Sequence, residues 1–362
     1  MVNNRAGNTS QRCGHFPAVI FSDRPVNQLN DYIQPKTAQE LCKKAQAIGF
    51  VDANTPQALY FFERIGYQRA SEYFDLFFIN NKLDNGASIR AINEAIVFDR
   101  KMQSIFLEYI GIFELQFRAR LSYSLSLKCG AFAHLNEKHF KNKKYYGEFL
   151  GTYHAEVARR LYARYTPIVS AYNKYQEIPV WIAVEVLSLG AISRLFANLK
   201  VKQVRHDVAD FFGVKSNVLD SWLRAISQLR NCCAHFSRVC GKDLISTPLR
   251  IPCFQKADNR RPFYMVLILE KLLSSRSIFT DDLSLVYAQN LAKDSMDLIY
   301  NNMQIAKLFG LPNNWEDLIL NKDILGMECH IFHNENIDAM PTKGIRCNTN
   351  MVVSNGFNAG RL

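Results

Sequence analysis

The sequence predicts an all-α protein, a multi-helix bundle with a small helical region before it. Apolar residues recur at spacings of three and four over long stretches, and residues that start or stop helices bound those stretches. No strand-like alternation persists anywhere along the chain. With 362 residues, 48% of them hydrophobic, the chain is long and apolar enough to bury a substantial core.

The first part of the chain divides into a polar end and a short helical region. Residues 1–16 are polar and are expected to be disordered, and residues 17–90 are expected to form the N-terminal helical region. Thr37 and Pro56 are residue types that begin helices, and Gly49 is one that ends them. The expected elements are helices at 37–49 and 56–65, an aromatic-rich run at 67–78 and a loop at 80–86.

Residues 91–326 are predicted to form the main helical domain. Its longest helix covers residues 92–128, which contain no proline and carry an apolar stripe that includes Ile105, Phe113 and Leu121. Residues 327–362 are rich in asparagine, lack periodicity and are expected to form a mobile tail. Further helices are expected at 141–165, 179–199, 201–212, 216–239, 264–275 and 281–308.

Charge and cysteine content indicate a cytoplasmic protein with an anionic partner. The net charge is +11 and the pI is about 9.2. Nucleic acid is the commonest partner of so basic a protein, although a basic protein without such a partner is the alternative. Nine cysteines with no Cys-x-x-Cys pair are typical of reduced thiols in the cytoplasm.

Metal, cofactor and membrane are not expected. Cys329, His330 and His333 have side chains that bind zinc, but no second cysteine pair accompanies them, so we predict no metal site and no cofactor. No secretory signal is visible at the N-terminus. The most apolar segment, residues 178–192, is too short to span a bilayer and contains Glu185.

The segment 216–239 carries the chemistry. On a helical wheel its apolar side is formed by Leu219, Trp222, Leu223, Ile226, Leu229 and Cys233, and a separate polar cluster by Arg224, Asn231, His235 and Arg238. Arg230 projects near the edge of the apolar stripe, where an unpaired guanidinium is costly. We therefore expect Arg230 either to have a carboxylate partner, for which Glu114 is the candidate, or to line a cleft between packed surfaces.

These residue types suit a metal-independent ribonuclease. Such an enzyme needs a base for the ribose 2′-hydroxyl, an acid for the leaving 5′-oxygen and positive charge on the phosphorane. Histidine serves as acid or base near neutral pH, and arginine offers a planar fork to phosphate oxygens. Because the helix has one histidine, two copies meeting at a two-fold axis would supply both groups, which predicts a homodimer.

Several segments resemble one family in the same order. Arg230-Asn-x-x-Ala-His235-x-x-Arg238 resembles a signature of the abortive-infection (Abi) family of the AbiD and AbiF type, bacterial phage-resistance proteins. The other similar segments are Ile65–Tyr73, Phe98–Lys101 with Glu114–Arg120, Ile178–Glu185 with Leu189-Gly190, and Leu311–Trp315. The resemblance covers residues 17–320. Where family members often continue with Trp-Asn-Arg, this chain has Val239-Cys-Gly-Lys242.

The resemblance implies a fold and an activity. The Abi family is related to the HEPN superfamily of helical RNA-acting domains, so a HEPN-like core is expected in residues 91–326. It implies that Arg230, Asn231 and His235 are catalytic and that Arg238 binds phosphate. The implied function is an endoribonuclease toxin that leaves 2′,3′-cyclic phosphate ends, causes abortive infection of phage-infected cells and is held inactive by an inhibitor, for which a small RNA is one candidate.

Weaker features support RNA contact. Basic and aromatic residues alternate over residues 138–165, a composition that suits single-stranded RNA or simply a solvated helix face. Glu114 and Arg118 form a possible i,i+4 pair that the resemblance places in the cleft, or an ordinary helix salt bridge. Two alternatives stay open: an RNA-binding module that uses the same cleft without catalysis, and a protein-interaction scaffold whose dimer interface includes this helix. The predicted RNA-binding residues are Arg224, Arg238, Lys143, Lys144, Arg159 and Arg160.

Overall fold

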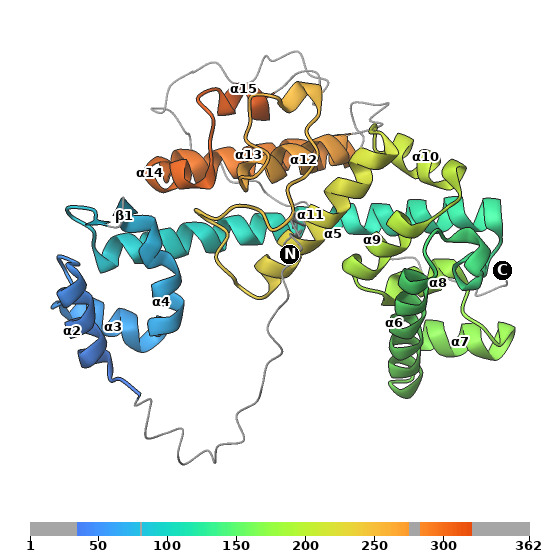
Figure 1. Cartoon of the computed structure of the whole chain (residues 1–362), viewed down its shortest axis with the longest axis horizontal. Helices are drawn as coiled ribbons and strands as arrows, with labels where there is room; N and C mark the ends of the chain where they lie inside the picture. Colours follow the sequence, from blue (N-terminus) through green and yellow to red (C-terminus); the bar gives the residue numbers. More distant parts are fainter. Residues whose placement is uncertain (1–34, 80–81, 275–282, 321–362) are drawn as a thin grey trace, which may run out of the picture.

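The computed structural model describes residues 35–79, 82–274 and 283–320, and it confirms the all-α prediction. A single helix of 41 residues, α5 (Ile89–Cys129), runs through the middle of the molecule, and the other helices pack along it (Figure 1). The Ser88 hydroxyl caps its start by accepting a hydrogen bond from the amide of Ala91 at 3.0 Å. Gly130 follows its last turn with a φ of 94°.

The N-terminal region packs against the start of α5. As predicted, helices lie at α2 (Ala38–Ile48) and α3 (Pro56–Ile65), and the aromatic-rich run begins with α4 (Tyr67–Phe74). A two-stranded antiparallel hairpin, β1 (Phe78–Ile79) with β2 (Lys82–Leu83), was not predicted, because two residues a strand are too few to establish an alternation.

The helices that follow α5 depart from prediction at two points: a helix over residues 166–175 was not expected, and the helix expected over residues 179–199 is broken. They are α6 (Lys143–Tyr162), α7 (Thr166–Tyr175), α8 (Val180–Val186), α9 (Leu189–Asn198) and α10 (Lys202–Phe211). The single helix predicted over residues 179–199 is wrong. Leu187 is extended at φ −84° and ψ 148°, and the Ser188 hydroxyl caps a new helix. Arg118 of α5 donates to the carbonyls of Val184 and Leu187, which holds this break in place.

The third group of helices holds the predicted functional segment. It consists of α11 (Ser216–Ala234), α12 (Phe263–Ser274), α13 (Leu283–Tyr300), α14 (Met303–Ala306) and α15 (Trp315–Ile319). Helix α11 packs on both α5 and α9, and α12 packs between α13 and α5. Short 3-10 turns lie at Asp75–Phe77, Ala133–Leu135, Glu137–His139, Pro252–Phe254 and Lys307–Phe309.

The buried side chains form two hydrophobic clusters that share α5. The first is built by α2 to α4 and by α5 as far as Ile96, and the second begins at Phe98 and extends through α15. The change of cluster falls near the predicted boundary at residues 90 and 91, although the division into domains stays a prediction. In the part of the chain described, no helix is both long and apolar enough to cross a bilayer.

Candidate functional site

Helix α11 ends at Ala234, so the predicted helix over residues 216–239 is too long. His235 is the C-cap residue, with φ −95° and ψ 6°. The amide of His235 still donates to the carbonyl of Asn231 at 3.0 Å, which keeps these two residues on the same side of the last turn. The helical wheel therefore placed Asn231 and His235 correctly on one face. It placed Arg238 wrongly, because Arg238 lies beyond the end of the helix.

The helix ends in a Schellman motif with an unusual residue in it. The amide of Phe236 donates to the carbonyl of Cys233 at 3.0 Å, and the amide of Ser237 donates to the carbonyl of Cys232 at 2.8 Å. This pair of bonds requires a left-handed residue between them, which is usually glycine. Here it is Phe236, with a φ of 55°. A left-handed backbone costs a residue with a side chain about 1–2 kcal/mol.

The polar residues of α11 divide by exposure. Asn231, His235 and Arg224 are exposed, which leaves the amide, the imidazole and one guanidinium open to solvent. Arg230 is partly buried, as the wheel predicted. Among the described residues it forms no ion pair, so the carboxylate expected beside it is absent from that part of the chain.

Glu114 contacts Arg118 instead of Arg230. The two form the i,i+4 ion pair that their spacing predicted, with both side chains largely buried. Because Arg118 also donates to the carbonyls of Val184 and Leu187, the pair joins α5 to α8 and to the turn after it. The prediction that Glu114 is the partner of Arg230 is therefore wrong. The Glu114–Arg118 pair serves instead to join α5 to α8.

Arg238 lies apart from the exposed cluster. It follows the helix in an irregular segment, and only 7% of its surface is exposed. Its guanidinium carbon is 5.9 Å from the centroid of the Tyr73 ring. Its Nε and Nη1 have no hydrogen-bond partner among the described residues. Arg238 thus faces the contact between its own loop and α4, while Asn231 and His235 face outward.

Asp99 of α5 fastens the segment that follows the motif. Its carboxylate accepts from the backbone amides of Val239 and Cys240, both at 2.9 Å. It also accepts from the Tyr73 hydroxyl at 2.7 Å and from the Gln103 amide at 3.3 Å. Asp99 and Tyr73 are fully buried. Four donors therefore converge on one buried carboxylate, which ties α4, α5 and the loop after α11 together.

Burial and charge act in opposite directions on this carboxyl. Burial is the largest influence and raises the pKa of Asp99, whereas its hydrogen bonds from Val239, Tyr73 and Cys240 and the charge of Arg238 lower it. The same burial, together with the charge of Asp99, raises the pKa of the Tyr73 hydroxyl far above its ordinary range. The four donors fit the ionised carboxylate, since three of them are N–H groups that cannot accept a hydrogen bond from a carboxyl proton.

Two arginines hold Phe236 from the same side of the molecule. Arg69 of α4 donates to the Phe236 carbonyl, and the guanidinium carbon of Arg100 lies 4.1 Å from the centroid of the Phe236 ring. The side-chain amide of Gln103 donates to the carbonyl of Ser237, the residue after Phe236, at 2.8 Å. Residues of α4 and α5 thus make three contacts with two successive loop residues, Phe236 and Ser237.

Sequence reasoning missed Asp99 as a site residue. One signal was present: Asp99 and Gln103 are polar, i,i+4 neighbours that stand next to the buried positions Phe98 and Met102. A polar pair on the core side of a long helix indicates a buried partner. The sequence does not indicate that this partner is the backbone of residues 239 and 240.

Comparison with protein families gives a match that spans these residues. Residues 60–240 match the family described as Abi-like protein. The chain belongs to this family. The match begins just before α4 and ends at Cys240, so it contains every residue of the Asp99 contact. Family membership suggests a role in abortive-infection defence against phage. Neither a curated protein nor a solved structure gave a significant match.

In this Abi-like chain, the predicted basic residues of α6 lie away from the end of α11. Helix α6 packs on α7, α8 and α9, and Figure 1 separates it from the C-terminal end of α11. Lys143 pairs with Glu137 at 3.0 Å, and Arg159 with Glu156. Lys144 has no ion pair among the described residues, and the guanidinium carbon of Arg160 lies 5.4 Å from the ring centroid of an exposed tyrosine, Tyr165.

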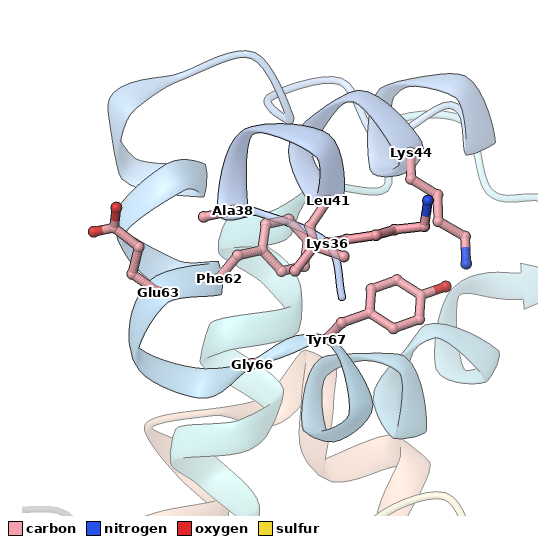
Figure 2. Close-up of a pocket in the computed structure, with 8 residues that line it drawn as sticks. All are labelled: Lys36, Ala38, Leu41, Lys44, Phe62, Glu63, Gly66 and Tyr67. Atoms are coloured by element: carbon pink, nitrogen blue, oxygen red, sulfur yellow. The ribbon is translucent and has the colours of Figure 1, made fainter. Parts of the chain in front are cut away.

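A cavity of about 580 Å³ lies between α2, α3 and α4, outside the predicted site (Figure 2). The Lys36 and Lys44 side chains point toward the Tyr67 hydroxyl end in that view, and the Lys44 ammonium is 4.2 Å from the Tyr67 ring centroid. No cluster of three or more metal-binding side chains occurs in residues 35–79, 82–274 and 283–320. Cys329, His330 and His333 lie outside those ranges.

Proposed function

We propose that this protein is a cytoplasmic, metal-independent endoribonuclease of abortive-infection defence, with its site at the end of α11. The observation that carries the proposal is that Asn231 and His235 are exposed together on a helix end that α4 and α5 fasten from behind. A reactive imidazole must be open to its substrate, and the backbone that follows this imidazole is held by contacts with α4 and α5.

The proposed reaction needs two proton transfers. One imidazole takes the proton of the ribose 2′-hydroxyl while the 2′-oxygen attacks phosphorus, and a second protonates the 5′-oxygen as its bond to phosphorus breaks. The products are a 2′,3′-cyclic phosphate and a free 5′-hydroxyl. His235 supplies one imidazole a protomer, so a homodimer supplies two. Arg230 offers charge to the phosphorane, and Asn231 a hydrogen bond to the phosphate.

A comparison of two histidine variants tests the activity. We expect the wild type to cut total RNA in EDTA, to leave 2′,3′-cyclic phosphate ends and to stop growth on expression. We expect His235→Ala to lose at least 100-fold in rate, in line with loss of general acid–base catalysis. His206→Ala removes an exposed histidine of α10 and is expected to behave as wild type. Equal toxicity of wild type and His235→Ala would refute the catalytic assignment.

RNA binding without catalysis is the second candidate, and the surface of α6 favours it. Tyr145 and Tyr162 are exposed there beside Lys143, Lys144 and Arg159. Such a surface would hold RNA without cutting it, for example a small regulatory RNA. Neutralising Lys143, Lys144, Arg159 and Arg160 together should weaken RNA binding and flatten its salt dependence while His235→Ala leaves both unchanged. No cleavage by any variant would favour this second candidate.

A further inference from the structure

Phe236 follows His235 directly and has features that a helix end does not require. Glycine would close the same Schellman motif without strain, yet the position holds a phenylalanine at φ 55°. The residue is 50% exposed, so its ring is not placed there to fill the core. A strained residue with an exposed aromatic ring beside a candidate reactive group calls for an explanation in function.

The ring is held in one orientation. The Arg100 guanidinium lies 4.1 Å from the ring centroid and covers one face. Arg69 donates to the carbonyl of Phe236 and the Gln103 side chain to the carbonyl of Ser237, while the Phe236 amide donates to the Cys233 carbonyl, so the backbone is held on both sides of the ring. Since one face is covered and half of the residue is accessible, the open part of the ring faces the solvent that a substrate would occupy.

We propose that Phe236 is a stacking platform for an unpaired nucleobase of the RNA whose phosphate reaches His235. This proposal rests on the proposed function and names its substrate class, single-stranded RNA. An aromatic face binds any base by stacking, and a base inside a duplex is not free to stack on it. The guanidinium behind the ring adds positive charge close to the phosphate backbone.

The alternative explanation for the Phe236 ring is that it only stabilises the end of α11 and does not bind RNA. In that case the contact between Phe236 and Arg100 only offsets the strained backbone. Removing the ring would then destabilise the fold and leave RNA binding unchanged. Stacking predicts the reverse, because glycine adopts a positive φ freely and the ring is needed only by the ligand.

The test uses a probe that cannot be cleaved. It is a 12-nucleotide 2′-O-methyl RNA with randomised flanks and a central 2-aminopurine, whose fluorescence falls on stacking. We expect the full-length wild type to quench it. Phe236→Gly should bind roughly 10-fold more weakly, without quenching, at an unchanged or higher melting temperature. Phe236→Trp should bind and quench like the wild type.

The control is Phe132→Ala, which removes another exposed phenylalanine, beyond the far end of α5, and should bind the probe as the wild type does. A duplex form of the probe should not be quenched. Wild-type-like binding and quenching by Phe236→Gly would overturn the proposal, as would a wild type that does not quench at all. Phe236→Asn, which lacks the aromatic ring and tolerates a positive φ, serves as a second variant if the glycine substitution fails to fold.

The experiment separates this proposal from the proposed function. The blocked 2′-oxygen makes probe binding independent of cleavage. Quenching by a wild type that cuts no RNA would refute the ribonuclease and keep the platform. Cleavage of RNA by a Phe236→Gly variant with unchanged probe affinity would refute the platform and keep the ribonuclease.

Discussion

Single residues decide how the end of α11 is held, and Asp99 is the most connected of them. Its two oxygens accept from four donors, three of which are N–H groups that cannot accept a hydrogen bond. An amide in this place would direct an N–H₂ group at another donor. We therefore expect Asp99→Asn to lower the free energy of unfolding by about 2 kcal/mol, measured in urea.

The matched control for that substitution is Asp210→Asn on α10, where the side chain is exposed. It should change the free energy of unfolding by less than about 0.5 kcal/mol. RNA cleavage by Asp99→Asn should also fall, because the loop that follows His235 loses its fixed position. An Asp99→Asn protein as stable as Asp210→Asn would contradict the importance given to the four hydrogen bonds.

The sequence predicted individual residues well where the helix is regular and poorly where it ends. The wheel placed Asn231 and His235 together and Arg230 at the edge of the apolar stripe, as the structure does. It misplaced Arg238, because a helix is expected to end at glycine and the left-handed residue here is Phe236. Asp99 escaped notice because its partners come from a distant part of the chain.

Whole elements show the same contrast between local and distant causes. The extent of α5 was predicted closely, since its apolar stripe and its capping residue are local features. The break between α8 and α9 was not predicted, although a capping residue, Ser188, and Gly190 stand beside it. It depends on Arg118, which binds the free carbonyls of the turn from another helix. A contact of this kind leaves no periodic signal in the sequence.

Helix α12 carries a carboxyl group in an unfavourable place. Every residue of this helix except Lys271 is buried, and Glu270 is fully buried with no hydrogen-bond partner for either oxygen among the described residues. Burial raises the pKa of Glu270 well above its ordinary value of 4.5. The folded protein therefore keeps this proton at pH values where the unfolded chain releases it.

The sign of the resulting pH dependence follows from proton counts. Between pH 4.5 and the raised pKa, the folded state binds one proton more than the unfolded state, so stability falls as pH rises. We expect Glu270→Gln to remove this fall, which amounts to at most about 1.4 kcal/mol for each pH unit. Urea unfolding at pH 5, 6, 7 and 8 measures it. Glu148→Gln, an exposed position on α6, should keep the wild-type slope, and parallel slopes for all three proteins would contradict the prediction.

At the scale of the whole molecule, one histidine at each site makes assembly part of the proposed chemistry. We expect a solution mass of about twice 41.6 kDa by light scattering. Specific activity should fall on dilution to concentrations at which only the monomer mass is seen. His235→Ala should keep the dimer mass and lose activity. Full activity in a protein that is monomeric at the assay concentration would contradict a site shared between protomers.

The Asp99 contact also means that the proposed site can form only late in the synthesis of the chain. Val239 lies 140 residues after Asp99, and the amide of Val239 must reach that carboxylate before the end of α11 is fixed. At about 5–20 residues per second, a ribosome needs on the order of 10 s to make the intervening chain. During that time the nascent protein contains Tyr73 and Asp99 but not the residues that Asp99 will bind, Val239 and Cys240. The ribonuclease activity that we propose would therefore begin only after synthesis has passed the motif.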